Sequence, residues 1–291
     1  MRAKSLLAVA VGALCFAPIA GAAPFFFDNG SPDGRMATAS RPSSAGKIEI
    51  ESADDFILGA NTQINSATFT GLLPIGFSAA DIGNVRVEIY RVFPKDSTNP
   101  PSGNVPTRTN SPSDVVFADR GIADSNLTYT TTVLNAVFSA ANSVVNGINK
   151  IPNQTTGGEG QVRGVEVQFN VNFTSPFVLP ADHYFFIPQV QLNTTGDFLW
   201  LSAPKPTSPP FVGDLQSWIR NANLDPDWLR IGTDIVGGSV APAPTFNASF
   251  SLSGDTPPPG GGGNPVPLPP GVWAGLVTAA GLGLARVRRR V

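Results

Sequence analysis

The chain has 291 residues, with 19 basic residues, 21 acidic residues and one histidine. Six of the basic residues lie in the two ends of the chain, so the body between the ends carries 13 basic minus 21 acidic residues, a net charge of −8. This acidic body, without clustered Lys or Arg, excludes nucleic acid and anionic lipid from the predicted partners, because both are recognised through concentrated positive charge.

Residues 1–22 have the organisation of a secretory signal peptide. Arg2 and Lys4 precede an apolar run over 6–19, and Ala20 and Ala22 supply the small residues that signal peptidase accepts. We predict export through the Sec machinery and cleavage after Ala22. An uncleaved N-terminal anchor is the alternative.

Residues 23–255 form the predicted globular body, and alternation of apolar and polar residues is its main pattern. The clearest run is 165–173, in which every odd residue is apolar and every even residue is polar, as a strand with one buried face requires. A second run covers 246–252, and shorter runs occur at 47–51, 85–89 and 187–192.

Two details qualify this pattern. Pro188 lies within the 187–192 run and indicates an edge strand or a bulge there, because proline cannot donate to the strand ladder. Only 134–145 could form a helix of any length, and its Val and Asn content disfavours one. Short strands separated by Gly, Pro and Asn turns predict an all-β fold, an antiparallel β-sandwich of jelly-roll type.

Residues able to support nucleophilic or zinc chemistry are scarce. The only cysteine, Cys15, lies in the signal peptide, so the mature chain has no thiol and no disulfide. His183, at a predicted strand start, cannot by itself build a triad or a zinc site, and we expect a half-exposed structural histidine. No catalytic residue and no metal site is predicted.

Two oxygen-rich segments and several acids leave alternatives open. Calcium could bind at 28–34 or at 225–227, although turn-forming Asx residues explain both segments equally well. A carboxylate pair for glycoside hydrolysis could be assembled by folding from strand-face acids, which are Glu49, Glu51, Glu88 and Glu166.

Three tryptophans lie close together in the sequence, at Trp200, Trp218 and Trp228. Trp200 stands between leucines and is predicted to be in the core. Trp218 and Trp228 stand near charged residues, so they are the candidates for an exposed platform that stacks on sugar rings. Burial of all three is the alternative.

The C-terminal end has three distinct parts. Residues 256–265, rich in Pro and Gly, form a predicted linker. Residues 266–291 then contain the motif Val266-Pro267-Leu268-Pro269-Pro270, an apolar segment at 271–285, and the cluster Arg286, Arg288, Arg289 and Arg290. The apolar segment is shorter than the roughly 20 residues of a stable spanning helix, and its arginines should stay on the cytoplasmic side. A eukaryotic GPI signal also joins a polar spacer to a hydrophobic tail, but such a tail normally ends with apolar residues. The four arginines at the end of this chain therefore disfavour a GPI signal.

This arrangement resembles the PEP-CTERM sorting signal of Gram-negative bacteria, in the variant that begins Val-Pro-Leu-Pro. Pro267 and Pro269 match the outer prolines of that motif, while Leu268 stands where its commonest form has Glu. The resemblance implies removal of the tail by an exosortase, an intramembrane cysteine transpeptidase. The body also resembles N-terminal domains of the same group, through Asp28-Asn29-Gly30 and Ala53-Asp54-Asp55-Phe56.

These observations predict a non-enzymatic protein that is anchored transiently in the inner membrane and then released to the cell surface or the extracellular matrix. Its expected partners are the exosortase and an exopolysaccharide. The alternative function is a secreted glycoside hydrolase or polysaccharide lyase that uses carboxylates.

Overall fold

The computed structural model describes residues 22–44, 46–98, 102–148, 155–204, 216–237 and 243–257. The predicted signal peptide up to residue 21, most of the linker, the sorting motif and the 271–285 segment lie outside the described residues. Within the described ranges, no helix is long and apolar enough to cross a membrane.

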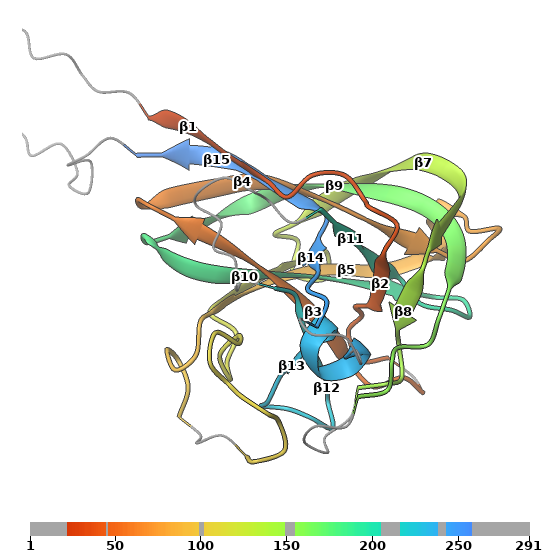
Figure 1. Ribbon diagram of the computed structural model, residues 1–291. Helices are drawn as coiled ribbons and strands as arrows, with labels where there is room; N and C mark the ends of the chain where they lie inside the picture. The colour runs from red at the N-terminus through yellow and green to blue at the C-terminus, as the bar shows by residue number, and fades with distance from the viewer. Residues whose placement is uncertain are drawn as a thin grey trace, which may run out of the picture. The chain divides into compact units, whose positions relative to one another are not determined.

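Two β-sheets make up the described chain (Figure 1). The larger sheet has the order β1-β15-β4-β11-β2-β8, with β9 also on β4, β7 on β9 and β14 on β11. Its strands are β1 (Ala23–Asp28), β2 (Met36–Ala39), β4 (Thr62–Leu73), β7 (Thr128–Ala140), β8 (Asn142–Val144), β9 (Val162–Leu179), β11 (Leu199–Ala203), β14 (Asn247–Ala248) and β15 (Phe250–Thr256).

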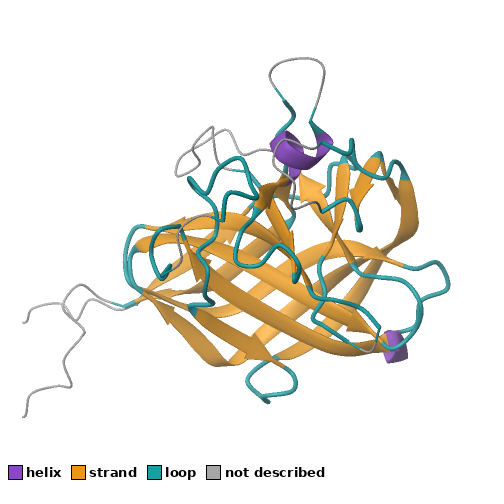
Figure 2. Ribbon diagram, turned by 90° about the horizontal axis from the view of Figure 1, so that it is seen from below, coloured by secondary structure: helices purple, strands orange, loops and turns teal. Residues whose placement is uncertain are grey.

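The smaller sheet has the order β13-β12-β3-β10-β5-β6. Its strands are β3 (Ile50–Leu58), β5 (Ile82–Arg91), β6 (Ala118–Gly121), β10 (Asp182–Leu192), β12 (Trp218–Asn221) and β13 (Leu229–Arg230). The short helical segments η1 (Ala79–Asp81) and η2 (Ile231–Val236) lie at the margin of the strands (Figure 2). All strand pairs are antiparallel except β2 with β8, so the all-β prediction is confirmed.

The main core lies between the two sheets and is rich in phenylalanine. Its residues come from alternate positions of the strands, as in β9, where Val167, Phe169 and Val171 are buried while Gln168 and Asn170 are partly exposed. Trp200 is 1% exposed and donates its indole N–H to the Ser249 carbonyl at 2.9 Å. The predictions of a strand at 165–173 and of a core position for Trp200 are therefore confirmed.

The 134–145 segment is extended, not helical. It forms the second half of β7 and all of β8, and β7 pairs with β9 through register shifts at Val133/Asn135 and Asn135/Phe138. The β-branched residues and threonines of β7 favour this pleated conformation. The Val and Asn content of 134–145 disfavours a helix in the sequence as well.

Pro188 lies in a central strand, at the point where that strand loses one neighbour. Pairing between β10 and β3 ends at Phe186, while pairing between β10 and β5 continues through Pro188. Ser40 fills the gap, because its hydroxyl donates to the Pro188 carbonyl at 2.6 Å and its carbonyl accepts from the Val190 N–H. A proline is tolerated here because no strand partner needs its missing N–H.

Candidate functional site

The platform predicted at Trp218 and Trp228 is wrong, because both side chains are buried. Trp218 is 2% exposed and Trp228 is 0% exposed, and both pack in a hydrophobic cluster separate from the main core, on the outer face of the smaller sheet. Trp228 donates its indole N–H to the Ser113 carbonyl at 3.1 Å and meets Tyr90 edge-on, with ring centroids 5.7 Å apart.

Two of the charged neighbours that indicated exposure, Arg220 and Asp227, are themselves buried in ion pairs. Arg220 is 5% exposed, pairs with Glu51 and stacks its guanidinium 4.4 Å from the Trp228 ring centroid. Asp227 is 0% exposed and accepts from Arg108 at 3.1 Å. Charge beside these tryptophans therefore marks a paired polar layer within the fold.

Three of the candidate acids converge on the outer face of the smaller sheet. Glu51 accepts from the Tyr90 hydroxyl at 2.8 Å and from the Arg220 guanidinium, and Glu88 lies within hydrogen-bonding reach of Glu51. Burial, followed by the negative charge of Glu51, raises the pKa of Glu88 to about 9. The Arg86 guanidinium, whose Nη2 lies 2.9 Å from Glu88 Oε1, opposes this rise in pKa, and the net direction favours the protonated form of Glu88 at pH 7.

This arrangement does not match the spacing that glycoside hydrolysis uses. Glycosidase carboxyl groups stand roughly 5 to 10 Å apart to admit substrate or water, whereas Glu51 and Glu88 are in contact and each is at most 4% exposed. Glu49 accepts from the Gln189 amide at 2.9 Å in the same region. Glu166 lies on the other sheet, so the four acids are not brought to one cleft.

His183 is a half-buried residue at the start of β10, as predicted, with its Nε2 3.0 Å from Asp55 Oδ2. The oxygens proposed for calcium serve turns and ion pairs. Asp28 accepts from the Gly30 N–H at 2.8 Å, and Asp225 accepts from Arg220 at 2.7 Å. Among the residues that the structure describes, no group of three His, Cys, Asp or Glu could hold a metal ion.

The outer face of the larger sheet is covered by neutral hydrogen-bonding side chains. Cross-strand register places Ser251, Thr68, Asn170 and Thr130 in one row across β15, β4, β9 and β7. Rows on either side have the same character. We call the set the hydroxyl–amide face, and its members are Ser66, Thr68, Thr70, Thr128, Thr130, Thr132, Gln168, Asn170, Asn172, Ser249, Ser251 and Ser253.

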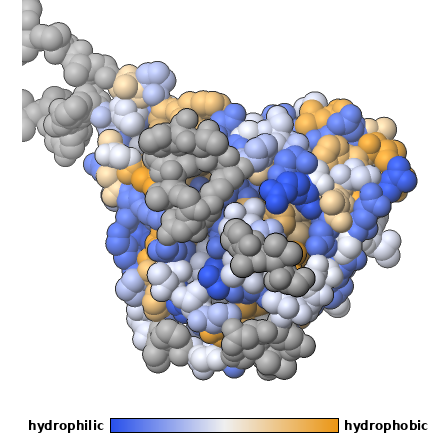
Figure 3. All heavy atoms as spheres, in the orientation of Figure 1, coloured by the Kyte–Doolittle hydropathy of each residue, from blue (hydrophilic) through white to orange (hydrophobic). Residues whose placement is uncertain are grey.

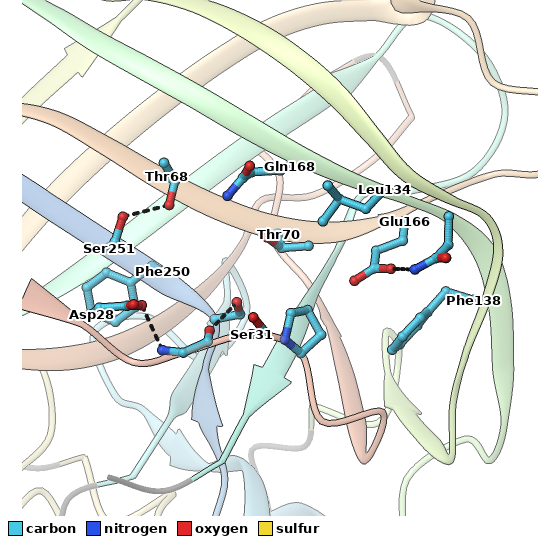
Figure 4. A pocket seen from close by; sticks show the side chains of 14 residues that line it. Asp28, Ser31, Thr68, Thr70, Leu134, Phe138, Glu166, Gln168, Phe250 and Ser251 are labelled. Carbon is cyan, nitrogen blue, oxygen red and sulfur yellow. Dashed lines mark hydrogen bonds between the residues drawn. The ribbon is translucent and has the colours of Figure 1, made fainter.

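A groove of about 490 Å³ opens on this face. Its floor is formed by part of the hydroxyl–amide face, namely Thr68, Thr70, Gln168, Ser249 and Ser251. Figure 4 shows Asp28 and Ser31 on one side and Leu134 and Phe138 on the other, with Glu166 beside Phe138. The groove therefore combines a polar floor with one apolar wall.

The Asp28-Asn29-Gly30 motif builds the first wall. The Asn29 side chain turns inward and donates to Asp54 Oδ2 at 2.7 Å, which fixes the end of β1. Gly30, with a φ of 89°, then turns the chain across the face, a conformation that glycine adopts without strain. Asp28 is left exposed at the groove, and the Ser249 hydroxyl ties the Gly30 carbonyl down at 2.8 Å.

Asp54 joins the two motifs of the body resemblance. It is 0% exposed and accepts from Asn29, from the Ser217 hydroxyl at 3.0 Å and from the Ala248 N–H at 2.8 Å. Burial, reinforced by neighbouring Asp55, raises its pKa well above the usual value. The second motif therefore positions the first, and both shape the groove.

The opposite wall comes from β7. Leu134 is 45% exposed, and its neighbours Val133 and Val137 are 57% and 53% exposed. Figure 3 shows this apolar surface at the upper right, over β7. Glu166, 3% exposed, accepts from the Asn135 side chain beside it. An apolar wall over hydroxyls and amides can take a ligand that is polar at its edges and apolar on its ring faces.

Sequence reasoning missed the groove, although a signal for it was present. Alternation alone predicts only that the polar positions of a strand face away from the core, and such solvated faces usually include charged residues. In β7, β9 and β15 these positions are nearly all Thr, Asn, Gln or Ser, as at Thr128, Asn170 and Ser251. That neutrality was visible, but the register that gathers the positions on one face was not.

Comparison with protein-family models, with curated proteins and with solved structures gives no match for this chain.

Proposed function

We propose that the protein is exported, sorted by its C-terminal signal to the cell surface or extracellular matrix, and non-enzymatic, and that it binds exopolysaccharide in the groove on the larger sheet. The single observation that carries the binding proposal is the neutral floor of hydroxyl and amide groups beside an apolar wall. Sugar rings offer hydroxyls at their edges and C–H groups on their faces, so this floor and wall complement them.

The strand order supports the jelly-roll type of sandwich that the sequence predicts. The first strand, β1, pairs with the last, β15, which pairs with β4, and β3-β10-β5-β6 form the second layer. Lectin domains are among the proteins built in this way. This likeness is one of architecture, so the binding proposal depends on the groove itself.

The binding proposal is tested by retention of the exported protein on the producing organism's own exopolysaccharide. Thr68→Val with Gln168→Ala removes two hydrogen-bonding groups from the floor, and each bond contributes about 1 kcal/mol. Retention should fall about tenfold or more, because 1.4 kcal/mol is a factor of ten. Thr131→Val is the matched control, since Thr131 pairs with core residue Phe169 and faces inward.

Equal retention of the floor variant and the Thr131→Val control would contradict binding of exopolysaccharide in the groove. The sorting part is tested separately by intact-mass measurement after expression in an exosortase-containing host. The mature protein should begin near Ala23 and lack the segment from Gly271 onward. Recovery of surface-released protein with the arginine cluster still attached would contradict sorting by tail removal.

A further inference from the structure

The hydroxyl–amide face extends well beyond the groove. Thr128, Asn172, Ser66 and Ser253 form a further row, in register with one another and outside the groove lining. Thr128 and Asn172 are exposed, and Ser66 and Ser253 are partly exposed. Hydroxyl and amide side chains of the same kind as those of the groove floor therefore continue on the exposed surface beyond the groove walls.

The dimensions of the face exceed those of a single sugar. Strands lie about 4.8 Å apart and alternate residues about 6.8 Å apart along each strand, so three rows across the four strands β15, β4, β9 and β7 cover roughly 14 by 14 Å. That span is several times the length of one pyranose ring. A ligand that used the whole face would be a chain of sugars, with its interior units on the sheet.

The charges of the site have one sign. Asp28 and Glu166 lie on opposite sides of the groove (Figure 4), and none of the described lining residues is Lys, Arg or His. All twelve members of the hydroxyl–amide face are uncharged. The body as a whole is also acidic, with 13 basic minus 21 acidic residues. A polymer bearing carboxylates or sulfates would meet repulsion here without any cation to pair with.

We infer that the groove and the hydroxyl–amide face together bind an internal segment of an uncharged polysaccharide, and that Asp28 and Glu166 turn acidic glycans away. This inference rests on the proposed function and narrows it to one class of ligand. The neutral face supplies donors and acceptors to sugar hydroxyls along the chain. The two carboxylates discriminate against uronates and sulfated sugars by like-charge repulsion.

The charge part is tested with pairs of polymers that differ only in charge. The full chain is expressed with its export signals, purified from the envelope or the medium, and applied to immobilised glucans, mannans and galactans and to their carboxymethyl derivatives. At low ionic strength, the best neutral polymer should retain the protein at least tenfold more strongly than its carboxymethyl form. Added salt should narrow the difference, because it screens the repulsion.

The length part uses oligosaccharides cut from that best neutral polymer. A hexasaccharide should bind at least tenfold more tightly than a disaccharide. Thr128→Val with Asn172→Ala, in the row beyond the groove, should weaken binding of the hexasaccharide severalfold and leave that of the disaccharide unchanged. Thr131→Val, on the inward face of the same strand, should change neither.

The outcomes distinguish failure of the inference, a preference for long uncharged polysaccharides, from failure of the proposed function, polysaccharide binding itself. A carboxymethyl polymer retained as strongly as its neutral parent, or equal affinity for the two oligosaccharides, would overturn the inference and leave polysaccharide binding standing. Retention on no polymer of either charge would overturn the proposed binding function itself.

Discussion

Glu88 shows how a buried carboxyl group links folding to pH. Its usual pKa is 4.5, and burial, with the charge of Glu51 next in size, raises the folded value to about 9. Between these two values the unfolded chain carries Glu88 ionised while the folded chain keeps it protonated. Its contribution to stability is therefore complete below pH 4.5 and is lost as the pH rises toward 9.

Glu88→Gln should remove this dependence, because an amide has no proton to lose. Between pH 5 and 9, the unfolding free energy of the wild type should fall relative to that of the variant by up to about 1.4 kcal/mol per pH unit. Urea unfolding at several pH values measures the difference. Asp124→Asn, at an exposed position, should keep the wild-type slope. Parallel slopes for wild type and Glu88→Gln would contradict a raised pKa at Glu88.

Trp228 gives a stability test of its assignment to the core. Trp228→Ala should destabilise the protein by about 3–5 kcal/mol, since it empties a buried site and frees the Ser113 carbonyl. Phe26→Ala is the matched control, because Phe26 is 68% exposed and its loss should cost less than about 1 kcal/mol. Thermal melts of both variants test this assignment. Similar melting temperatures for the two variants would contradict a core position for Trp228.

At the scale of elements, β3 organises the fold through Asp54. Three segments far apart in the sequence donate to this one carboxyl group, from Asn29, Ser217 and Ala248. Asn29 directly follows β1, Ser217 directly precedes β12, and Ala248 lies in β14. The buried side chain of Asp54 thus fixes the position of the chain at the edge of the groove, through Asn29, and the positions of β12 and β14.

Asp54→Ala should be costly because it leaves three buried donors without an acceptor. Each unsatisfied group costs about 1–3 kcal/mol, so we expect a loss of at least about 3 kcal/mol in unfolding free energy. Asp124→Ala, on the exposed surface, is the control and should stay within about 0.5 kcal/mol of the wild type. A loss at Asp54 no larger than the control's would mean that its hydrogen bonds are replaced by water.

Local pattern was enough to predict some elements and not others. The alternation of 165–173 predicted a strand with one buried face, because one side of β9 packs on the core. The same alternation in β3 and β5 predicts that their outer faces are exposed to solvent, yet Glu51 and Glu88 are buried on those faces. Glu51 is covered by Arg220, which stacks on Trp228, and both lie more than a hundred residues away, so no local pattern carries that information. For the same reason the charged neighbours of Trp218 and Trp228 were misleading.

At the scale of the whole molecule, the ends of the body are held together. Ala23 pairs with Thr256 and Asp28 with Ser251, so β1 and β15 run side by side over their full length. Residues 22–256 form one compact unit. In the sequence, the prolines and glycines of residues 256–265 follow directly after β15.

A fragment of residues 22–257 should fold alone and give a far-UV circular dichroism spectrum dominated by β structure. A fragment of residues 29–249 should not melt cooperatively, because it lacks β1 and β15 and with them core residues Phe27, Phe250 and Leu252. Cooperative melting of the shorter fragment, or a helical spectrum for the longer one, would contradict this account of the sheet.

The pairing of the first strand with the last also fixes when the larger sheet can be completed as the chain is synthesised. The Thr256 hydroxyl donates to the Ala23 carbonyl across 233 residues of sequence, and β1 has no described partner other than β15. A chain that emerges from its N-terminus, from ribosome or translocon, must carry β1 unpaired until almost the entire body has followed it. During that interval the side of β4 that pairs with β15 in the finished sheet stays unpaired. Completion of the sheet is thereby tied to completion of the chain.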